Sequence, residues 1–202
     1  GISLEIKPGT SPHDTPTEGT NTTHYSIVDH AGNAVSVTYT LNGWFGAGVT
    51  AKGTGILLNN EMDDFSVKPG VPNMYGALGN EKNAITPGKR MLSSMTPTIV
   101  LKNNTPYIVA GTPGGTTIPT SVFQTLVNIL DFGMSAEDAV NKPKFHHQWL
   151  PDEIMIERDF DKLAKKQLQQ MGYTIKDRGQ IGRTEVIVIT TEKGKRIVTA
   201  VG

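Results

Sequence analysis

The sequence predicts an α+β fold, and two observations lead to it. Short runs of alternating apolar residues occur toward both ends of the chain, each bounded by glycine, proline or asparagine. Between them, one segment repeats its apolar residues with helical spacing. The 202 residues, with 22 Gly and 12 Pro, suffice for one domain with many turns and short strands.

The first elements are a linker and a hairpin. Residues 6–21 are rich in proline, glycine and threonine and predict an extended linker. Residues 23–29 and 33–41 predict two strands around a turn at Gly32. A three-residue loop places Thr22 opposite Thr40, whereas a two-residue loop places Thr23 there. In both registers Thr40 lies within cross-strand reach of Thr22.

The middle of the chain is less regular. Residues 53–65 predict a short apolar strand that runs into an acidic loop. Residues 68–89 hold several prolines and glycines without periodicity, and a loop of this length is often functional, for example as a lid. Residues 96–101 and 107–110 predict a second hairpin.

Helices and a final pair of strands complete the prediction. From Pro119 and Thr120 onward the spacing predicts a helix that ends at Gly133, with an apolar face made by Val122, Phe123, Leu126, Val127, Ile129 and Leu130. Ser135 predicts the N-cap of a short second helix that stops before Pro143. A more polar third helix is expected over 159–171. Residues 185–190 and 196–201 predict strands.

Composition excludes several classes of function. The 19 basic and 19 acidic residues balance, which argues against nucleic acid or an anionic membrane as the main partner. The absence of cysteine excludes disulfides, thiolate metal sites and cysteine catalysis. No apolar run reaches the length of about 18 residues that a membrane-spanning helix needs. The first residue is Gly1 and no signal peptide follows it, which is typical of a processed or excised piece.

A threonine cluster is the leading candidate for covalent chemistry. Thr22, Thr23, Thr40 and Asn42 gather at one end of the first hairpin. Threonine is common in strands, so β-propensity alone explains most such clusters. A threonine becomes a nucleophile when its own free α-amine serves as the base, and for Thr22 this requires cleavage of the Asn21–Thr22 bond.

Three further groups could form a site. Glu61, Asp63 and Asp64 could bind an ammonium group or a metal, or could be a solvated loop. Gly114 and Gly115 precede a helix, where N–H groups can hold an anion or an oxyanion, although a tight turn also explains them. Ser93 and Ser94 could hold a carboxylate. His24, His146 and His147 lack metal-motif spacing, and the calcium-loop pattern is absent.

Several blocks in order resemble the small-subunit region of γ-glutamyltranspeptidases, which are N-terminal-nucleophile hydrolases. The resemblance covers residues 22–202, and residues 1–21 resemble the end of the large subunit. The matching blocks include Thr22-Thr23-His24-Tyr25-Ser26, Thr38-Tyr39-Thr40-Leu41-Asn42, Gly55-Ile56-Leu57-Leu58-Asn59-Asn60-Glu61-Met62-Asp63-Asp64-Phe65, Ser93-Ser94-Met95-Thr96-Pro97-Thr98, Gly114-Gly115 and Phe145-His146-His147-Gln148-Trp149-Leu150-Pro151-Asp152.

The resemblance implies a fold and a reaction. The chain would form part of a four-layer αββα sandwich that the large subunit of the same precursor completes. The reaction would be γ-glutamyl transfer and hydrolysis on glutathione-like compounds, with an amino acid, a peptide or water as acceptor. The family requires no cofactor or metal for this, and its members are usually periplasmic, secreted or at the membrane surface.

The resemblance also implies roles for individual residues. Thr22 would be the nucleophile, first in the cleavage after Asn21 and then in acyl transfer. Thr40 would position Thr22, and Gly114 and Gly115 would form the oxyanion hole. The remaining roles are those of the substrate clamp and its cover: Asn42, Glu61 and Asp64 for the α-ammonium, Ser93 and Ser94 for the α-carboxylate, and Tyr75 as the gating residue of the lid.

Two alternatives stay open at the level of the sequence. One is a relative with another acyl preference, such as a cephalosporin (glutaryl) acylase or a poly-γ-glutamate transpeptidase of capsule polymers. The other is an unprocessed homologue without catalytic activity. Asp64 with Ser93 and Ser94 favours the γ-glutamyl interpretation over the first, and the intact Thr22, Thr40, Gly114 and Gly115 count against the second.

Overall fold

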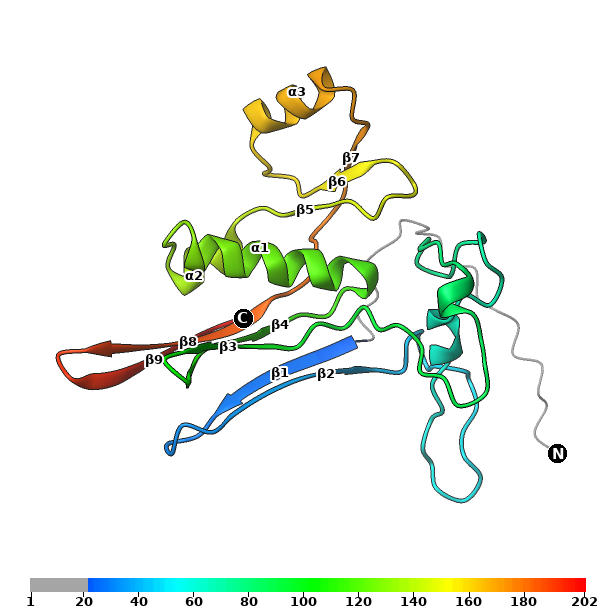
Figure 1. Ribbon diagram of the computed structural model, residues 1–202, viewed down its shortest axis with the longest axis horizontal. Helices are drawn as coiled ribbons and strands as arrows, with labels where there is room; N and C mark the ends of the chain where they lie inside the picture. Colours follow the sequence, from blue (N-terminus) through cyan, green and yellow to red (C-terminus); the bar gives the residue numbers. More distant parts are fainter. Residues whose placement is uncertain (1–21) are drawn as a thin grey trace.

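The computed structural model describes residues 22–202. The linker predicted for residues 6–21 and the residue Asn21 therefore lie outside the described residues. The described part contains a two-stranded, a four-stranded and a three-stranded sheet together with helices, and Figure 1 shows their arrangement. The predicted α+β class is confirmed.

The first hairpin consists of β1 (Thr22–Val28) and β2 (Ala34–Thr40). Thr22 pairs with Thr40, which is the register of a three-residue loop. The Asp29 N–H donates to the Asn33 carbonyl at 3.0 Å, and the Asn33 N–H donates to the Asp29 carboxylate at 2.8 Å. Gly32 has a φ of 92°, a value that suits glycine. The predicted juxtaposition of Thr22 and Thr40 is confirmed.

A four-stranded antiparallel sheet forms the centre of the molecule. Its strands are β3 (Thr98–Lys102), β4 (Thr105–Gly111), β8 (Glu185–Glu192) and β9 (Lys195–Val201), in the order β3-β4-β8-β9. The helices α1 (Ile118–Leu130) and α2 (Ala136–Asn141) cover one face. The core between them contains Ile108, Ala110, Ile129, Ala136, Ala139, Val186 and Val188.

The first hairpin covers the other face of this sheet, so α1 and α2, the sheet and the hairpin form three layers (Figure 1). Polar groups join the two strand layers. The Ser36 hydroxyl donates to the Ala110 carbonyl at 3.0 Å, and the buried His24 ring lies against Gly111. The outward face of the hairpin is apolar and exposed, with exposed fractions of 53% for Ile27 and 58% for Tyr39.

Helix α1 differs from its prediction in the face it buries. Its buried residues are Ile118, Ser121, Val122, Thr125 and Ile129, whereas Phe123 is 65% exposed and Leu130 is 48% exposed. The apolar face predicted from Phe123 and Leu130 is therefore wrong at these two positions. The buried face of the helix is narrow and includes the small side chains of Ser121 and Thr125. Phe123 lies outside this face and is exposed to solvent.

Helix α2 follows its predicted cap, whereas α3 begins later than predicted. Ser135 accepts a hydrogen bond from the Asp138 N–H at 3.1 Å and begins α2, as predicted. Helix α3 (Lys162–Gln170) starts three residues later than expected, because Asp161 caps it. The short strands β5 (Phe145–His146), β6 (Ile154–Ile156) and β7 (Ile175–Asp177) were not predicted, since two or three residues cannot show a period.

Residues 41–97 form the long irregular region at the end of the hairpin (Figure 1). It contains the 3-10 turns η1 (Glu61–Asp64) and η2 (Glu81–Asn83) and isolated bridges such as Thr50 with Leu57. The strand predicted over 53–65 is wrong. Gly53 and Gly55 adopt φ values of 81° and 72°, which interrupt an extended chain, and only a short apolar run follows them.

Candidate active site

Thr22 stands at the beginning of β1 with only 8% of its surface exposed. Its cross-strand neighbour Thr40 ends β2, and the Thr40 hydroxyl accepts a hydrogen bond from the Asn42 N–H at 2.8 Å. That bond turns the chain sharply, and Asn42 takes a φ of 71°. The hairpin thus brings Thr22, Thr40 and the buried Asn42 to one end.

His24 holds this end of the hairpin against the central sheet. Its Nδ1 lies 2.7 Å from the Thr38 hydroxyl and its Nε2 lies 3.0 Å from the Ser26 hydroxyl. A Cβ placed on Gly111 would lie 2.1 Å from the ring, so the ring occupies the space that only glycine leaves. Burial lowers the pKa of His24, which favours the neutral ring. The sequence did not indicate this role.

Gly114 and Gly115 form the turn between β4 and α1. Their φ values are 142° and 56°, both residues are buried, and the 3-10 turn η3 (Gly115–Thr117) leads into α1. The prediction that they precede a helix is confirmed. Since His24 fixes β1 on the last residue of β4, this turn lies three residues beyond that contact.

Tyr75 covers this turn. A Cβ on Gly115 would meet the Tyr75 ring at 3.0 Å, so the ring lies directly on the glycine. The Tyr75 hydroxyl donates to the Asn42 carbonyl at 2.8 Å. Burial and the nearby carboxylates raise the pKa of Tyr75, so it stays a donor. Tyr75 therefore bridges the end of the hairpin and the Gly114–Gly115 turn.

Glu61 and Asp64 are partly buried carboxylates on η1. Burial and the charge of Asp64 raise the pKa of Glu61 to about 7. Burial and the charge of Asp63 raise the pKa of Asp64 to about 6. None of the ion pairs formed within residues 22–202 involves these groups. The arrangement favours a cation as ligand, because a positive charge would stabilise both ionised forms.

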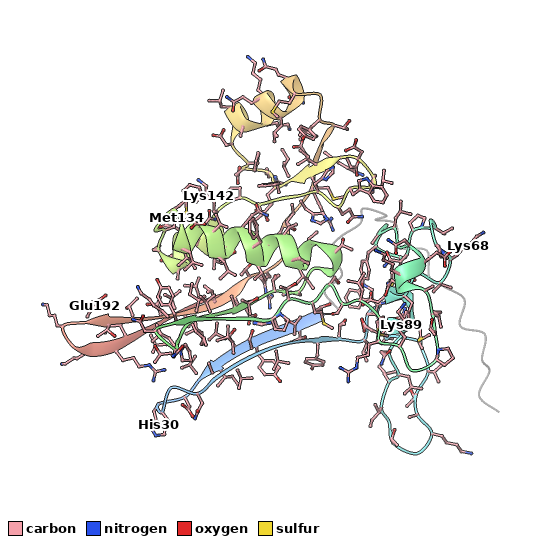
Figure 2. The ribbon with its side chains drawn as sticks, in the orientation of Figure 1. His30, Lys68, Lys89, Met134, Lys142 and Glu192 are labelled. Carbon is pink, nitrogen blue, oxygen red and sulfur yellow. The ribbon has the colours of Figure 1, made fainter. Side chains whose placement is uncertain are left out.

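Neighbouring lysines do not neutralise this pair. Lys68 is exposed and points away from the loop (Figure 2). The ammonium group of Lys89 donates to the carbonyls of Lys82 and Ala84. Asp63, the third carboxylate of the cluster, accepts a hydrogen bond from the Met74 N–H at 3.1 Å and so holds the residue next to Tyr75.

Two asparagines join η1 to the rest of the site. The Asn60 side chain accepts from the Gly43 N–H at 2.8 Å, and its carbonyl accepts from the Asn42 side chain at 3.3 Å. The Asn83 side chain donates to the Asp64 carbonyl at 2.7 Å and accepts from the Leu92 N–H at 3.1 Å. The sequence reasoning missed both roles. The frequency of asparagine in this irregular region was the available signal.

Ser93 and Ser94 lie next to Leu92 on the segment that enters β3. The Ser93 hydroxyl accepts from the Met95 N–H at 3.1 Å, and the Ser94 carbonyl accepts from the Thr96 hydroxyl at 3.2 Å. These bonds are local and fix the segment. Asn83 is what connects the segment to Asp64.

A cavity of about 180 Å³ lies beside this site, between η1 and the loop that carries Tyr75. Its lining includes Asp63, Asp64, Ser66, Asn73 and Asn83 but neither Thr22 nor Gly115. Ser66 is buried, and its hydroxyl has no hydrogen-bond partner among the described residues. The cavity therefore includes neither the candidate nucleophile nor the glycine turn.

His146 and His147 bond to side chains outside the carboxylate cluster. His146 bonds to Thr120 and Gln148, and His147 pairs with Asp152 at 3.1 Å. Within residues 22–202, no group of three or more histidine, aspartate or glutamate side chains is placed to hold a metal ion.

The sequence model of the family described as Gamma-glutamyltranspeptidase matches residues 5–202. The chain belongs to this family. Its relatives include the glutathione hydrolase proenzymes of Pseudomonas sp. strain A14, 61% identical over 78% of this chain, and of Escherichia coli, 51% identical over 93% of it. This chain spans 27% of the first relative and 32% of the second, so about a third of their length or less.

Solved structures of the gamma-glutamyltranspeptidase family share the fold. A mutant of the Helicobacter pylori enzyme has a TM-score of 0.84 at 48% identity, over 89% of this chain and 97% of that chain. The Pseudomonas nitroreducens enzyme complexed with L-DON has a TM-score of 0.76 at 49% identity, over 88% and 93%. Bacillus anthracis CapD is more distant, with a TM-score of 0.63 at 25% identity over 89% and 93%.

Proposed function

We propose that residues 22–202 are the small catalytic subunit of a γ-glutamyltransferase and glutathione hydrolase, and that residues 1–21 end its large subunit. Cleavage between Asn21 and Thr22 would make Thr22 the N-terminal residue. One observation carries the proposal. Tyr75 bridges the Gly114–Gly115 turn and Asn42, and Asn42 lies at the same end of the hairpin as the nearly buried Thr22.

The chemistry follows from these groups. The α-amine of Thr22, with an ordinary pKa of about 7.7, takes the hydroxyl proton while Oγ1 attacks the γ-carbonyl carbon. The N–H groups of Gly114 and Gly115 stabilise the oxyanion. The C–N bond of the donor breaks, the amine leaves with that proton, and a γ-glutamyl ester of Thr22 remains. Water or the amine of an amino acid or peptide then attacks the ester and releases Thr22.

The substrate would be held by its far end. Glu61 and Asp64, with the Asn42 side chain, would bind the α-ammonium group, and Ser93 and Ser94 would bind the α-carboxylate. Binding of the ammonium would return both carboxylates to the ionised form, which their burial now disfavours. Thr40 would position the Thr22 hydroxyl. Such contacts convert binding into orientation at the reacting carbonyl.

The large subunit is the proposed partner. The three layers of the described residues leave the apolar outer face of the hairpin exposed, and a helical layer from the large subunit would complete an αββα sandwich. Relatives named as proenzymes support this pairing. Glutathione or another γ-glutamyl compound is the proposed substrate. The proposed location is periplasmic or secreted; within residues 22–202 no helix has both the length and the apolar character needed to cross a bilayer.

The rival acyl preferences have weaker support. The cephalosporin acylase of Bacillus halodurans is 26% identical and CapD is 25% identical, against 48–49% for the structures named gamma-glutamyltranspeptidase. Asp64 and the pair of serines suit a substrate end that carries both charges. An acylase for glutaryl groups has no ammonium to bind and gains nothing from these carboxylates.

The test uses the precursor that contains the proposed large subunit. We expect faster turnover of a γ-glutamyl anilide than of a glutaryl anilide, and loss of both cleavage and turnover in Thr22→Ala.

Asp64→Asn should raise KM for the γ-glutamyl anilide about 10-fold or more, because a charge-assisted hydrogen bond is lost. The same variant should leave KM for the glutaryl anilide unchanged. Faster turnover of the glutaryl compound would contradict the γ-glutamyl assignment. An intact 21–22 bond under all conditions would favour a non-catalytic homologue.

A further inference from the structure

Gln148 has a partly buried side-chain amide that hydrogen-bonds to residues of the candidate active site and its surroundings. Its Oε1 accepts from the Thr116 hydroxyl at 2.8 Å and lies 3.0 Å from His146 Nε2. Its Nε2 donates to the carbonyls of Tyr75 at 3.4 Å and Leu150 at 3.3 Å. None of the roles assigned above uses this side chain.

These contacts connect the Gly114–Gly115 turn to the loop that carries Tyr75. Thr116 directly follows Gly115, so Oε1 is bound to the glycine turn. Tyr75 carries the ring that lies on Gly115, so Nε2 is bound to the backbone of the lid. Gly76 also lies beside the amide, since a Cβ there would be 3.5 Å from the Gln148 Nε2, an ordinary contact distance.

The orientation of the amide is fixed by its surroundings. Thr116 donates to Oε1, and His146 Nε2 can donate to the same oxygen. A reversed amide would set its oxygen against the carbonyls of Tyr75 and Leu150, which can only accept hydrogen bonds. The N–H groups of Gln148 therefore face the lid.

We propose that Gln148 is a positioning residue that holds the Tyr75 lid and the Gly114–Gly115 turn in one fixed relative geometry. It acts through the backbone of Tyr75 and the hydroxyl of Thr116 rather than on the substrate. Its kinetic consequences rest on the proposed function, whereas its effect on the motion of the lid does not. The hydrogen bond from Gln148 to the lid is long and therefore weak, so its loss should have a modest effect on the lid. The bond to the Thr116 hydroxyl is shorter and should restrain the turn more strongly.

Two variants separate these contacts. Gln148→Glu keeps an oxygen for Thr116 and His146 but turns its second oxygen toward the carbonyls of Tyr75 and Leu150, so it removes the hold on the lid. Gln148→Leu removes the hydrogen bonds to both the lid and the turn. Gln124 provides a matched control. It is also a partly buried glutamine, and its side chain makes three bonds at 2.7–3.1 Å to Thr120 and Phe145, none of them to the lid or the turn.

The variants are compared in the processed full enzyme. We expect Gln148→Glu to raise KM for a γ-glutamyl anilide about 3- to 10-fold with kcat within about 2-fold. Gln148→Leu should raise KM similarly and also lower kcat about 3- to 10-fold, since the turn loosens. Hydrogen exchange of the amides of Gly76 and Ala77 should become at least about 3-fold faster in both. Gln124→Leu should lower Tm and leave KM, kcat and this exchange unchanged.

Two results would overturn the proposal. One is that both Gln148 variants lower Tm as Gln124→Leu does, while KM and lid exchange stay at the wild-type values. The other is that Gln148→Leu and Tyr75→Phe multiply their effects on KM, because residues that act through one lid must fall short of the product. If the wild-type enzyme turns over no γ-glutamyl compound, the proposed function fails, and lid exchange alone still decides the role of Gln148.

Discussion

The carboxyl groups of Glu61 and Asp64 carry the clearest chemical signature in the chain. Both are partly buried, both have a neighbouring carboxylate, and the nearby lysines are turned elsewhere. Their pKa values of about 7 and about 6 mean that each holds a proton more tightly than in the unfolded chain. The free energy of unfolding therefore falls as pH rises from about 4 to 7, because the folded state disfavours the ionised carboxylates. An ammonium ligand would offset this loss by stabilising the ionised forms.

Substrate binding should consequently depend on pH through Glu61. At pH 5 Glu61 is protonated and resembles glutamine, whereas at pH 8 it is ionised and attracts the ammonium group. We expect the ratio of KM in Glu61→Gln to KM in the wild type to rise from about 1 at pH 5 to about 10 at pH 8, the effect of one charge-assisted hydrogen bond. The ratio cancels the titration of the Thr22 amine and of the substrate. A ratio that stays constant from pH 5 to 8 would contradict this role for Glu61.

At the scale of elements, the contact between β1 and β4 determines where the nucleophile lies. His24 packs onto Gly111 with no room for a methyl group, and two residues along β1 stands Thr22. Gly111 in turn ends β4 and begins the segment that leads to Gly114. This contact therefore sets the strand of the proposed nucleophile against the strand that leads to the proposed oxyanion hole.

Gly111→Ala should therefore damage both stability and activity. Because the added Cβ would lie 2.1 Å from the His24 ring, we expect a loss of about 1–3 kcal/mol in stability, the usual effect of overpacking, seen as a lower Tm. We also expect a lower kcat, since β1 must move. Gly179→Ala is the control, because no atom lies within 4 Å of its Cβ. Equal Tm values for the two variants would show that the contact is not close.

Local signals predicted the regular elements well and the loops poorly. Gly32 predicted the hairpin turn, and the resulting register put Thr22 opposite Thr40. Ser135 predicted the start of α2 in the same way. Both signals act within a few residues of the chain. The strand expected at 53–65 failed because tertiary contacts and two left-handed glycines override a short apolar run.

The candidate site was predictable only where a motif marked it. Thr22 and the glycine pair were candidates from their own sequence patterns, and the resemblance added Tyr75. The structure added the contacts of Tyr75 with Gly115 and with the Asn42 carbonyl. Asn60, Asn83 and Gln148 escaped notice because side-chain amides in loops have many uses. Each of them has a partner that lies between 9 and 73 residues away in the sequence, and only the fold brings such groups together.

For the whole molecule, the outer face of the first hairpin is a candidate interface. Tyr25, Ile27, Val35 and Tyr39 are exposed by 41–58%, and they alternate with the buried polar face that packs on the central sheet. Apolar side chains contiguous on a strand pair are typical of a covered interface. The proposed large subunit would cover them.

Charges on this face should accordingly impair assembly. We expect Tyr39→Glu to lower the amount of stable two-subunit enzyme, measured by size-exclusion chromatography and intact mass, because assembly would bury an unpaired carboxylate. Lys193→Glu, at the exposed turn between β8 and β9, is a control for added charge. Assembly of Tyr39→Glu at the wild-type level would place the interface elsewhere.

Maturation is the whole-molecule event on which the proposed chemistry depends. Thr22 can serve as its own base only after the Asn21–Thr22 bond is cut, and Asn21 lies at the end of the segment that precedes the described fold. The most direct measurement is intact mass spectrometry of the purified precursor after incubation. We expect two fragments with Thr22 as the new N-terminus in the wild type, and one uncut chain in Thr22→Ala. A wild-type chain that turns over γ-glutamyl substrate while uncut, or cleavage of Thr22→Ala at the wild-type rate, would contradict the proposed role of Thr22.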